Sequence, residues 1–174
     1  MSEFESGNAA FAAFNEEART TASFTAPVQR TKLLLPIVVG GASAGILDMT
    51  SAFITFGPNM PRGIAAGLIG RQAAINGGIG TWILGLFLHY FIAFSAAAVY
   101  CLASRKLTFL KDHFVVCGLF YGIAVFLVMN LVVLPLSARH FAGPYQLRGL
   151  IEGLLAHMVI IGLPISFSLW KFSD

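Results

Sequence analysis

Charged residues are scarce in this sequence. Asp, Glu, Lys and Arg together make up 11% of its 174 residues, whereas hydrophobic residues make up 57%. Soluble domains carry about 25% charged residues, and a chain of this length cannot hide so much apolar surface in its own core. The mean hydropathy of +0.79 therefore excludes a water-soluble globular domain and predicts that lipid surrounds most of the chain.

The chain also lacks the common motifs of chemistry and of nucleic-acid binding. Its two cysteines, Cys101 and Cys117, predict neither a disulfide framework nor a metal motif. The net charge of +3 comes without a cluster of basic residues, so nucleic acid is not an expected partner. Walker loops and the G-x-S-x-G, H-E-x-x-H and C-x-x-C patterns are absent from the sequence. An enzyme acting on lipid is therefore the least favoured interpretation, because no nucleophile has a base in sequence reach.

Four apolar runs are each long enough to cross a bilayer as a helix. They cover residues 33–56, 79–102, 114–136 and 149–170. None of them contains Lys or Arg. About 20 apolar residues span the hydrocarbon layer, and a helix satisfies its own backbone polar groups there. The sequence predicts an all-α membrane protein, a bundle of four transmembrane helices in one domain that covers residues 32–174.

Two segments outside these runs receive separate predictions. Residues 1–31 are polar and predict a disordered cytoplasmic tail. The alternative is a short helix with Phe4, Phe11 and Phe14 on one face, and a secretory signal is not expected. Residues 57–78 are too polar to span, and the helical spacing of their apolar residues predicts a short interfacial helix. A plain loop is the alternative for this connection.

The distribution of Lys and Arg predicts the orientation in the membrane. The tail, the loop at 103–113 and the C-terminus carry Arg19, Arg30, Lys32, Arg105, Lys106, Lys111 and Lys171. The opposite side carries Arg62, Arg71, Arg139 and Arg148. Cytoplasmic loops are the richer in Lys and Arg. The excess of seven over four therefore predicts that both termini lie in the cytoplasm.

Each predicted span carries small residues at four-residue spacing, which is the mark of a close-packing face between helices in lipid. These residues are Gly41 and Gly45, Gly85, Ala93 and Ala97, Gly118 and Gly122, and Gly149 and Gly153. Residues three, four, seven or eight apart share one face of a helix. By this rule each span places one polar residue near its packing face. These four residues are Asp48, His89, Asn130 and His157.

The same polar residues lie at similar depths in the membrane. Counted from one side of the membrane, they lie roughly 2–7 Å beyond the midpoints of their spans, and Glu152 lies roughly 10 Å beyond. The sequence thus predicts a polar layer in the outer half of the membrane. Ionisable groups at such depth cost about 2.5–3.5 kcal/mol on insertion scales and are functional candidates. Two members have structural interpretations: Asn130 as a hydrogen-bonding link between helices, and Glu152 as the partner of Arg148.

Three kinds of chemistry fit Asp48, His89 and His157. Two histidines at matched depth can supply the axial ligands of a haem iron. Two histidines and a carboxylate can instead bind a divalent metal ion. The same three residues can relay protons. The spacing does not choose among these, so haem and a divalent metal stay open as cofactors.

Three stretches of the chain carry a family resemblance. They are LGLFLHYFIAFSAAAVY in the second run, GLFYGIAVFLVMNLVVLPLSA in the third and GLLAHMVIIGLP in the fourth. With them, the region from about Lys32 to Lys171 resembles the YagU-like small bacterial inner-membrane proteins, which also tend to carry histidine at the positions of His89 and His157. The resemblance implies an inner-membrane location and the fold, and it implies no reaction because the family has no settled activity.

The sequence therefore predicts an inner-membrane protein whose polar layer handles protons, metal ions or a small solute. A haem-binding electron-transfer subunit and a non-catalytic accessory subunit are the alternatives. Four spans leave little room for a pathway, so a homo-oligomer or a larger membrane complex is the expected assembly.

Overall fold

The structure is a computed structural model that describes residues 33–139 and 146–172. All regular structure within these ranges is helical. Four helices are long and apolar enough to cross a membrane, so the protein is an integral, multi-pass membrane protein with an all-α bundle. The predicted tail, residues 1–31, lies outside the described residues.

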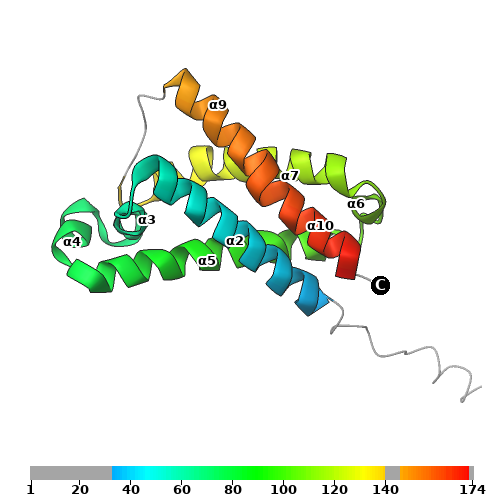
Figure 1. The fold of residues 1–174 in the computed structure, drawn as a ribbon, viewed down its shortest axis with the longest axis horizontal. Coiled ribbons are helices and arrows are strands. Elements are labelled where there is room, and N and C mark those ends of the chain that lie inside the picture. The colour runs from blue at the N-terminus through cyan, green and yellow to red at the C-terminus, as the bar shows by residue number, and fades with distance from the viewer. Residues whose placement is uncertain (1–32, 140–145, 173–174) are drawn as a thin grey trace, which may run out of the picture. The chain divides into compact units, whose positions relative to one another are not determined.

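The four spans agree with the predicted runs to within two residues at each end. Span one is α2, Leu34–Phe56, and span two is α5, Gly78–Ala103. Span three joins α7, Phe114–Val128, to the π-helical segment η2, Met129–Val133, and to α8, Leu134–Leu136. Span four joins α9, Leu147–Ala156, to the π-helical segment η3, His157–Gly162, and to α10, Leu163–Phe172. Figure 1 shows α9 and α10 as one continuous rod.

Both π-helical segments end just before a proline. Pro135 follows η2 and Pro164 follows η3, each as the second residue of the next helix. Proline has no N–H group, and its ring clashes with the carbonyl group four residues earlier. A wider turn relieves that clash. The irregularity before Pro164 therefore takes the form of a π-helical turn on its N-terminal side.

The connection between spans one and two forms two short helices instead of one. They are α3, Met60–Ile69, and α4, Arg71–Asn76. Gly70 separates them with a φ of 81°, a value that residues with a side chain rarely adopt. Helix α3 packs along α5 and buries Pro61, Ala65 and Ala66. It therefore differs from a helix that lies only on the membrane surface, because it also contacts span two.

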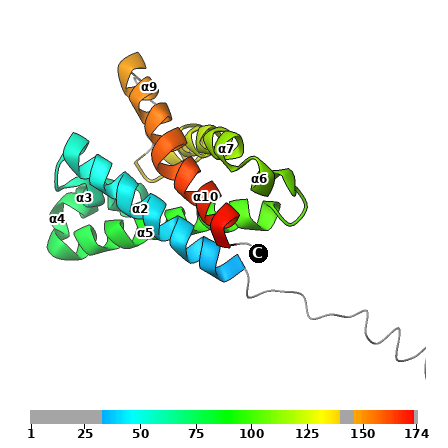
Figure 2. The ribbon, with the colours of Figure 1, turned by 45° about the vertical axis from the view of Figure 1, so that its right-hand side comes forward.

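Helix α2 lies between α5 and α10, and packs against both (Figures 1 and 2). On the α5 side, a Cβ atom at Gly45 would lie 2.8 Å from the ring of Tyr90. On the α10 side, a Cβ atom at Gly40 would lie 3.2 Å from Cβ of Ser168. The predicted small-residue face of span one is therefore a true packing face, and Gly40 extends it to a second neighbour.

Spans three and four cross at a cluster of glycines. A Cβ atom at Gly122 would lie 2.5 Å from Cα of Met158, and one at Gly118 would lie 2.9 Å from the carbonyl oxygen of Gly162. The prediction for span four was wrong at Gly149, where a Cβ atom would meet no packing neighbour among the described residues within 4 Å. Helices that cross touch only near the crossing point, and this point falls at Gly162, in the π-helical segment.

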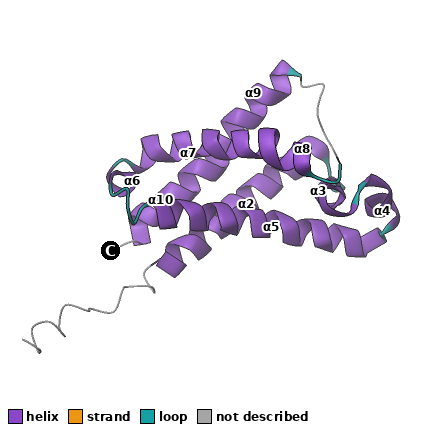
Figure 3. Ribbon diagram, turned by 180° about the vertical axis from the view of Figure 1, so that it is seen from behind, coloured by secondary structure: helices purple, strands orange, loops and turns teal. Residues whose placement is uncertain are grey.

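The buried core lies where α2, α5, α10 and η3 meet, at one end of the bundle. Its members include Ala44, Tyr100, Cys101, Ile165 and Leu169. In Figure 3, which views the bundle from behind, α5 and α7 lie toward the viewer and α2 and α10 cross behind them. Helices α5 and α7 meet mainly through tyrosine side chains. The connecting helix α6, Phe109–Asp112, joins their ends.

Candidate functional site

Asp48 and His89 come together at the contact between α2 and α5. The Nδ1 atom of His89 lies 3.9 Å from Oδ2 of Asp48. The Nε2 atom of the same ring lies 2.9 Å from the carbonyl oxygen of Gly45, one turn before Asp48 on α2. Gly45 permits this approach because it has no side chain to cover its backbone. The predicted packing face of span one therefore lies beside two of the predicted polar residues, Asp48 and His89.

The hydrogen bond to Gly45 determines where His89 carries its proton. A carbonyl oxygen only accepts, so Nε2 is the donor and holds a hydrogen atom. In the neutral ring, Nδ1 then has a lone pair that faces the carboxyl group of Asp48. A proton on either Nδ1 or the carboxyl group removes the repulsion between lone pair and carboxylate. The Nδ1 atom of His89 and the Asp48 carboxyl group thus face each other between two spans.

The attraction between His89 and Asp48 depends on whether Nδ1 of His89 carries a proton. At 3.9 Å the two atoms are too far apart for a hydrogen bond. With the proton on Nδ1, the pair becomes an ion pair, and opposite charges about 4 Å apart attract by about 4 kcal/mol at an effective dielectric of 20. His89 is buried, with a side chain 11% exposed, whereas the Asp48 side chain is 28% exposed. The carboxyl group is therefore the more exposed member of the pair.

His157 has a different set of neighbours. It begins η3, and its Nδ1 atom lies 2.8 Å from the carbonyl oxygen of Gly153 in the preceding turn. Its ring packs edge-to-face on Phe126 of α7, with centroids 5.4 Å apart. The contacts of His157 thus lie between spans three and four, whereas those of His89 lie between spans one and two.

Asn130 belongs to the same side of the bundle as His157. Its Nδ2 atom donates a hydrogen bond of 2.9 Å to the carbonyl oxygen of Phe126. Phe126 therefore contacts both polar residues, Asn130 through its backbone and His157 through its ring. Both polar residues lie in π-helical segments, η2 and η3, which are frequent at functional sites.

Glu152 lies apart from these buried groups. Its Oε1 atom accepts a hydrogen bond of 2.7 Å from Nε of Arg148, the pairing that the four-residue spacing predicts. The two side chains are 58% and 89% exposed. The five predicted members of the polar layer are therefore divided among three places in the bundle, and only Asp48 and His89 form a pair of ionisable groups with each other.

Haem or metal binding by the histidines requires a ring nitrogen with a lone pair free to act as a ligand. Nε2 of His89 donates to the carbonyl oxygen of Gly45, so Nδ1, which lies near Asp48, is the ring nitrogen left with a lone pair. Across residues 33–139 and 146–172, no three His, Cys, Asp or Glu side chains gather closely enough to hold a metal ion. The two histidines thus contact different pairs of spans, and the described residues assemble no metal-binding trio.

The sequence did not single out the Gly45 carbonyl group, although this group determines the tautomer of His89. A signal for it existed, because a glycine three residues before an intramembrane aspartate leaves a backbone oxygen accessible to a neighbouring helix. The two tyrosines Tyr100 and Tyr121 were also missed. Their rings lie 4.8 Å apart, and they line a pocket described below.

Comparisons with known proteins identify no relative, so a functional assignment depends on this geometry. The chain matches no protein-family model. Searches of curated proteins and of solved structures likewise find no match.

Proposed function

We propose that this membrane protein takes up and releases protons within the bilayer through the pair of Asp48 and His89. The observation that carries the proposal is the orientation of the His89 ring. Its Nε2 atom is committed to the carbonyl oxygen of Gly45, which turns Nδ1 toward the Asp48 carboxyl group at 3.9 Å. Imidazole is the side chain that exchanges a proton near neutral pH. An ionisable pair inside transmembrane segments is costly, and such pairs mark proton or ion pathways.

Proton handling is favoured over the other uses predicted for the polar layer. Axial haem ligation by two histidines needs the two rings opposite each other, whereas His89 contacts span one and His157 contacts span three. A divalent metal ion prefers more donors than the single carboxylate and imidazole offered here. A proton requires only the two groups that the pair supplies.

We further propose the location and the assembly in which the pair acts. The excess of Lys and Arg on one side supports an inner-membrane protein with both termini in the cytoplasm. The resemblance to YagU-like proteins supports the same location. The Asp48 side chain is 28% exposed in the single chain, and a second copy or a partner subunit would cover it. An oligomer is therefore the assembly that best suits a proton pathway past this residue.

The test measures proton flux and proton binding separately. Purified protein is placed in liposomes that contain a pH-sensitive dye, and a pH gradient is applied. We expect flux in the wild type, loss of flux in Asp48→Asn and in His89→Gln, and unchanged flux in Glu152→Gln. The last variant is the matched control, because it neutralises an exposed carboxylate of the same bundle.

Infrared spectroscopy of the same samples across a pH series reports proton binding itself. We expect a carboxyl band that titrates in the wild type and is lost in Asp48→Asn. Equal flux in the wild type and Asp48→Asn, or no flux in any sample, would contradict a pathway. A titrating band that Asp48→Asn leaves in place would contradict proton binding by the pair.

A further inference from the structure

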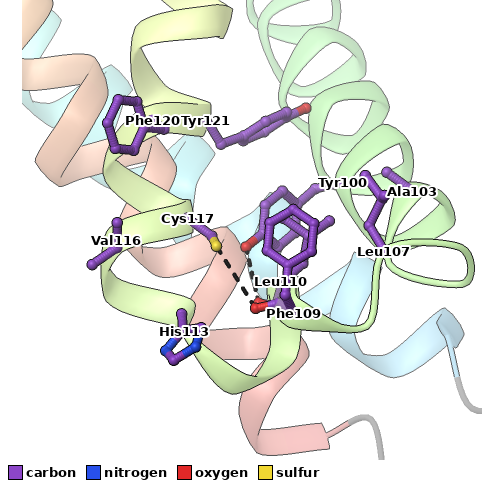
Figure 4. Close-up of a pocket in the computed structure, with 10 residues that line it drawn as sticks. All are labelled: Tyr100, Ala103, Leu107, Phe109, Leu110, His113, Val116, Cys117, Phe120 and Tyr121. Atoms are coloured by element: carbon purple, nitrogen blue, oxygen red, sulfur yellow. Dashed lines mark hydrogen bonds between the residues drawn. The ribbon is translucent and has the colours of Figure 1, made fainter.

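An apolar pocket lies between the end of span two and the beginning of span three. Its volume is about 580 Å³, which falls in the range of small-molecule sites. Figure 4 shows its walls, which come from α5, from the connection that contains α6, and from α7. Main contributors are Tyr100, Ala103, Leu110, Val116 and Tyr121.

The two tyrosines of the pocket turn their hydroxyl groups to the backbone. The Tyr100 hydroxyl donates a hydrogen bond of 3.2 Å to the carbonyl oxygen of Leu110. The Tyr121 hydroxyl donates one of 2.6 Å to the carbonyl oxygen of Ala96. Because these polar groups are satisfied, the rings present apolar surface to the pocket. An occupant of the interior is therefore expected to be a hydrocarbon chain and not a polar solute.

The pocket is closed at one end and open at the side. Helix α6 covers the end, where the Cys117 thiol lies 3.7 Å from the carbonyl oxygen of Phe109 (Figure 4). At the side, Val116 and Phe120 line the pocket but are 55% and 67% exposed. Since these residues belong to a transmembrane helix, the side opening faces lipid. A bilayer acyl chain can enter there without crossing water.

The connection that covers this end of the pocket is rich in basic residues. The connection between spans two and three carries Arg105, Lys106 and Lys111, and its single carboxylate is Asp112. His113 from the same connection lines the pocket. Tyr121 lies two helical turns inside span three, so the pocket reaches roughly 10 Å from the headgroup level into the hydrocarbon. Basic residues at the headgroup level attract anionic lipid headgroups.

We propose that this pocket binds an anionic phospholipid of the surrounding bilayer. One acyl chain lies between α5 and α7 against Tyr100 and Tyr121, and the phosphate group lies against Lys106 and Lys111. The apolar interior selects the chain, and the charged connection selects the headgroup. This site is separate from Asp48 and His89, so it does not depend on the proton-handling proposal.

The first test compares two neighbouring valines. Full-length protein in mild detergent is titrated with phosphatidylglycerol or with phosphatidylcholine of the same acyl chains, and bound lipid is counted by native mass spectrometry. We expect tighter binding of phosphatidylglycerol to the wild type. Val116→Trp fills the pocket and should reduce binding of both lipids. Val115→Trp is the matched control, because Val115 is also exposed on α7 but does not line the pocket.

The second test removes the charges while the pocket stays open. The double variant Lys106→Gln and Lys111→Gln should weaken phosphatidylglycerol binding by about 30-fold, or about fivefold for each charge. Binding of phosphatidylcholine should not change. The control is Arg71→Gln with Arg148→Gln, which removes the same charge at the opposite ends of the spans and should leave lipid binding unchanged.

Two results would overturn the proposal. One is equal lipid binding by Val116→Trp and Val115→Trp, with circular dichroism showing both folded. The other is equal affinity of the wild type for the two lipids. If Val116→Trp does not fold, the charge variants still decide the question, because an unchanged phosphatidylglycerol affinity in the lysine variant contradicts the site.

Discussion

Gly85 of α5 lies directly against the backbone of Pro61 in α3, with no room for a Cβ atom between them. The contact holds the helix that follows span one against span two. We expect Gly85→Ala to destabilise the protein by about 1–3 kcal/mol, the usual cost of overpacking. Backbone cannot move aside as a flexible side chain can, so the whole of α3 must shift. Chemical unfolding in mixed micelles measures the change.

Gly80 is the matched control for Gly85, since it belongs to the same helix. No heavy atom of the described residues lies within 4 Å of a Cβ atom built there. Gly80→Ala should be neutral or stabilise by about 0.5–1 kcal/mol, because alanine is the better helix former. Equal stabilities of the two alanine variants would show that α3 does not pack on α5 in this way.

The crossing of spans three and four leads to a second prediction. Gly122→Ala should destabilise by about 1–3 kcal/mol, because its Cβ atom would lie 2.5 Å from Cα of Met158. Gly149→Ala should have no destabilising effect, since its surroundings among the described residues are open. Thermal unfolding in detergent distinguishes the variants. A larger loss at Gly149 than at Gly122 would contradict the crossing point.

A buried hydrogen bond between the first and last spans leads to a third prediction. The Ser168 hydroxyl donates to the carbonyl oxygen of Pro36 at 3.0 Å, and Ser168 is 1% exposed. Ser168→Ala should cost about 0.5–1.5 kcal/mol. Ser95→Ala is the control, because the exposed Ser95 hydroxyl bonds within its own helix, to Phe91. If the two variants unfold alike, Ser168 does not link the spans.

The Asp48 and His89 pair leads to a fourth prediction, about coupling. A double-mutant cycle with Asp48→Asn and His89→Gln, measured by unfolding in detergent, should give a coupling energy of about 0.5–3 kcal/mol. The exposed pair of Arg148 and Glu152 provides the comparison and should give less than about 1 kcal/mol. Additive effects of Asp48→Asn and His89→Gln would show that the two side chains do not interact.

The fold was largely predictable because its main signal is local. Apolar runs without Lys or Arg locate helices in lipid, and the span ends differ from the prediction by at most two residues, as at Leu147 and Phe172. The connection between spans one and two was less predictable. The packing of Pro61 on Gly85 depends on a contact across the fold, whereas the break at Gly70 is a local effect of a glycine with a positive φ.

The candidate site was predictable in part. Asp48 and His89 were placed on facing surfaces by their spacing from Gly45 and Gly85, and the structure brings these two side chains together. His157 was expected in the same layer by depth. Its contacts with Gly153 and Phe126 place it between other helices, a choice that depth alone cannot make.

The sequence by itself therefore determined the membrane class, the number and limits of the spans, and the polar residues that are expensive to bury. Each of these follows from local composition and from helical periodicity. Only the tertiary structure decided which polar side chains meet, because crossing helices bring only a few residues into contact. The π-helical segments before Pro135 and Pro164 add to this effect, since a wider turn rotates every later residue to a new face.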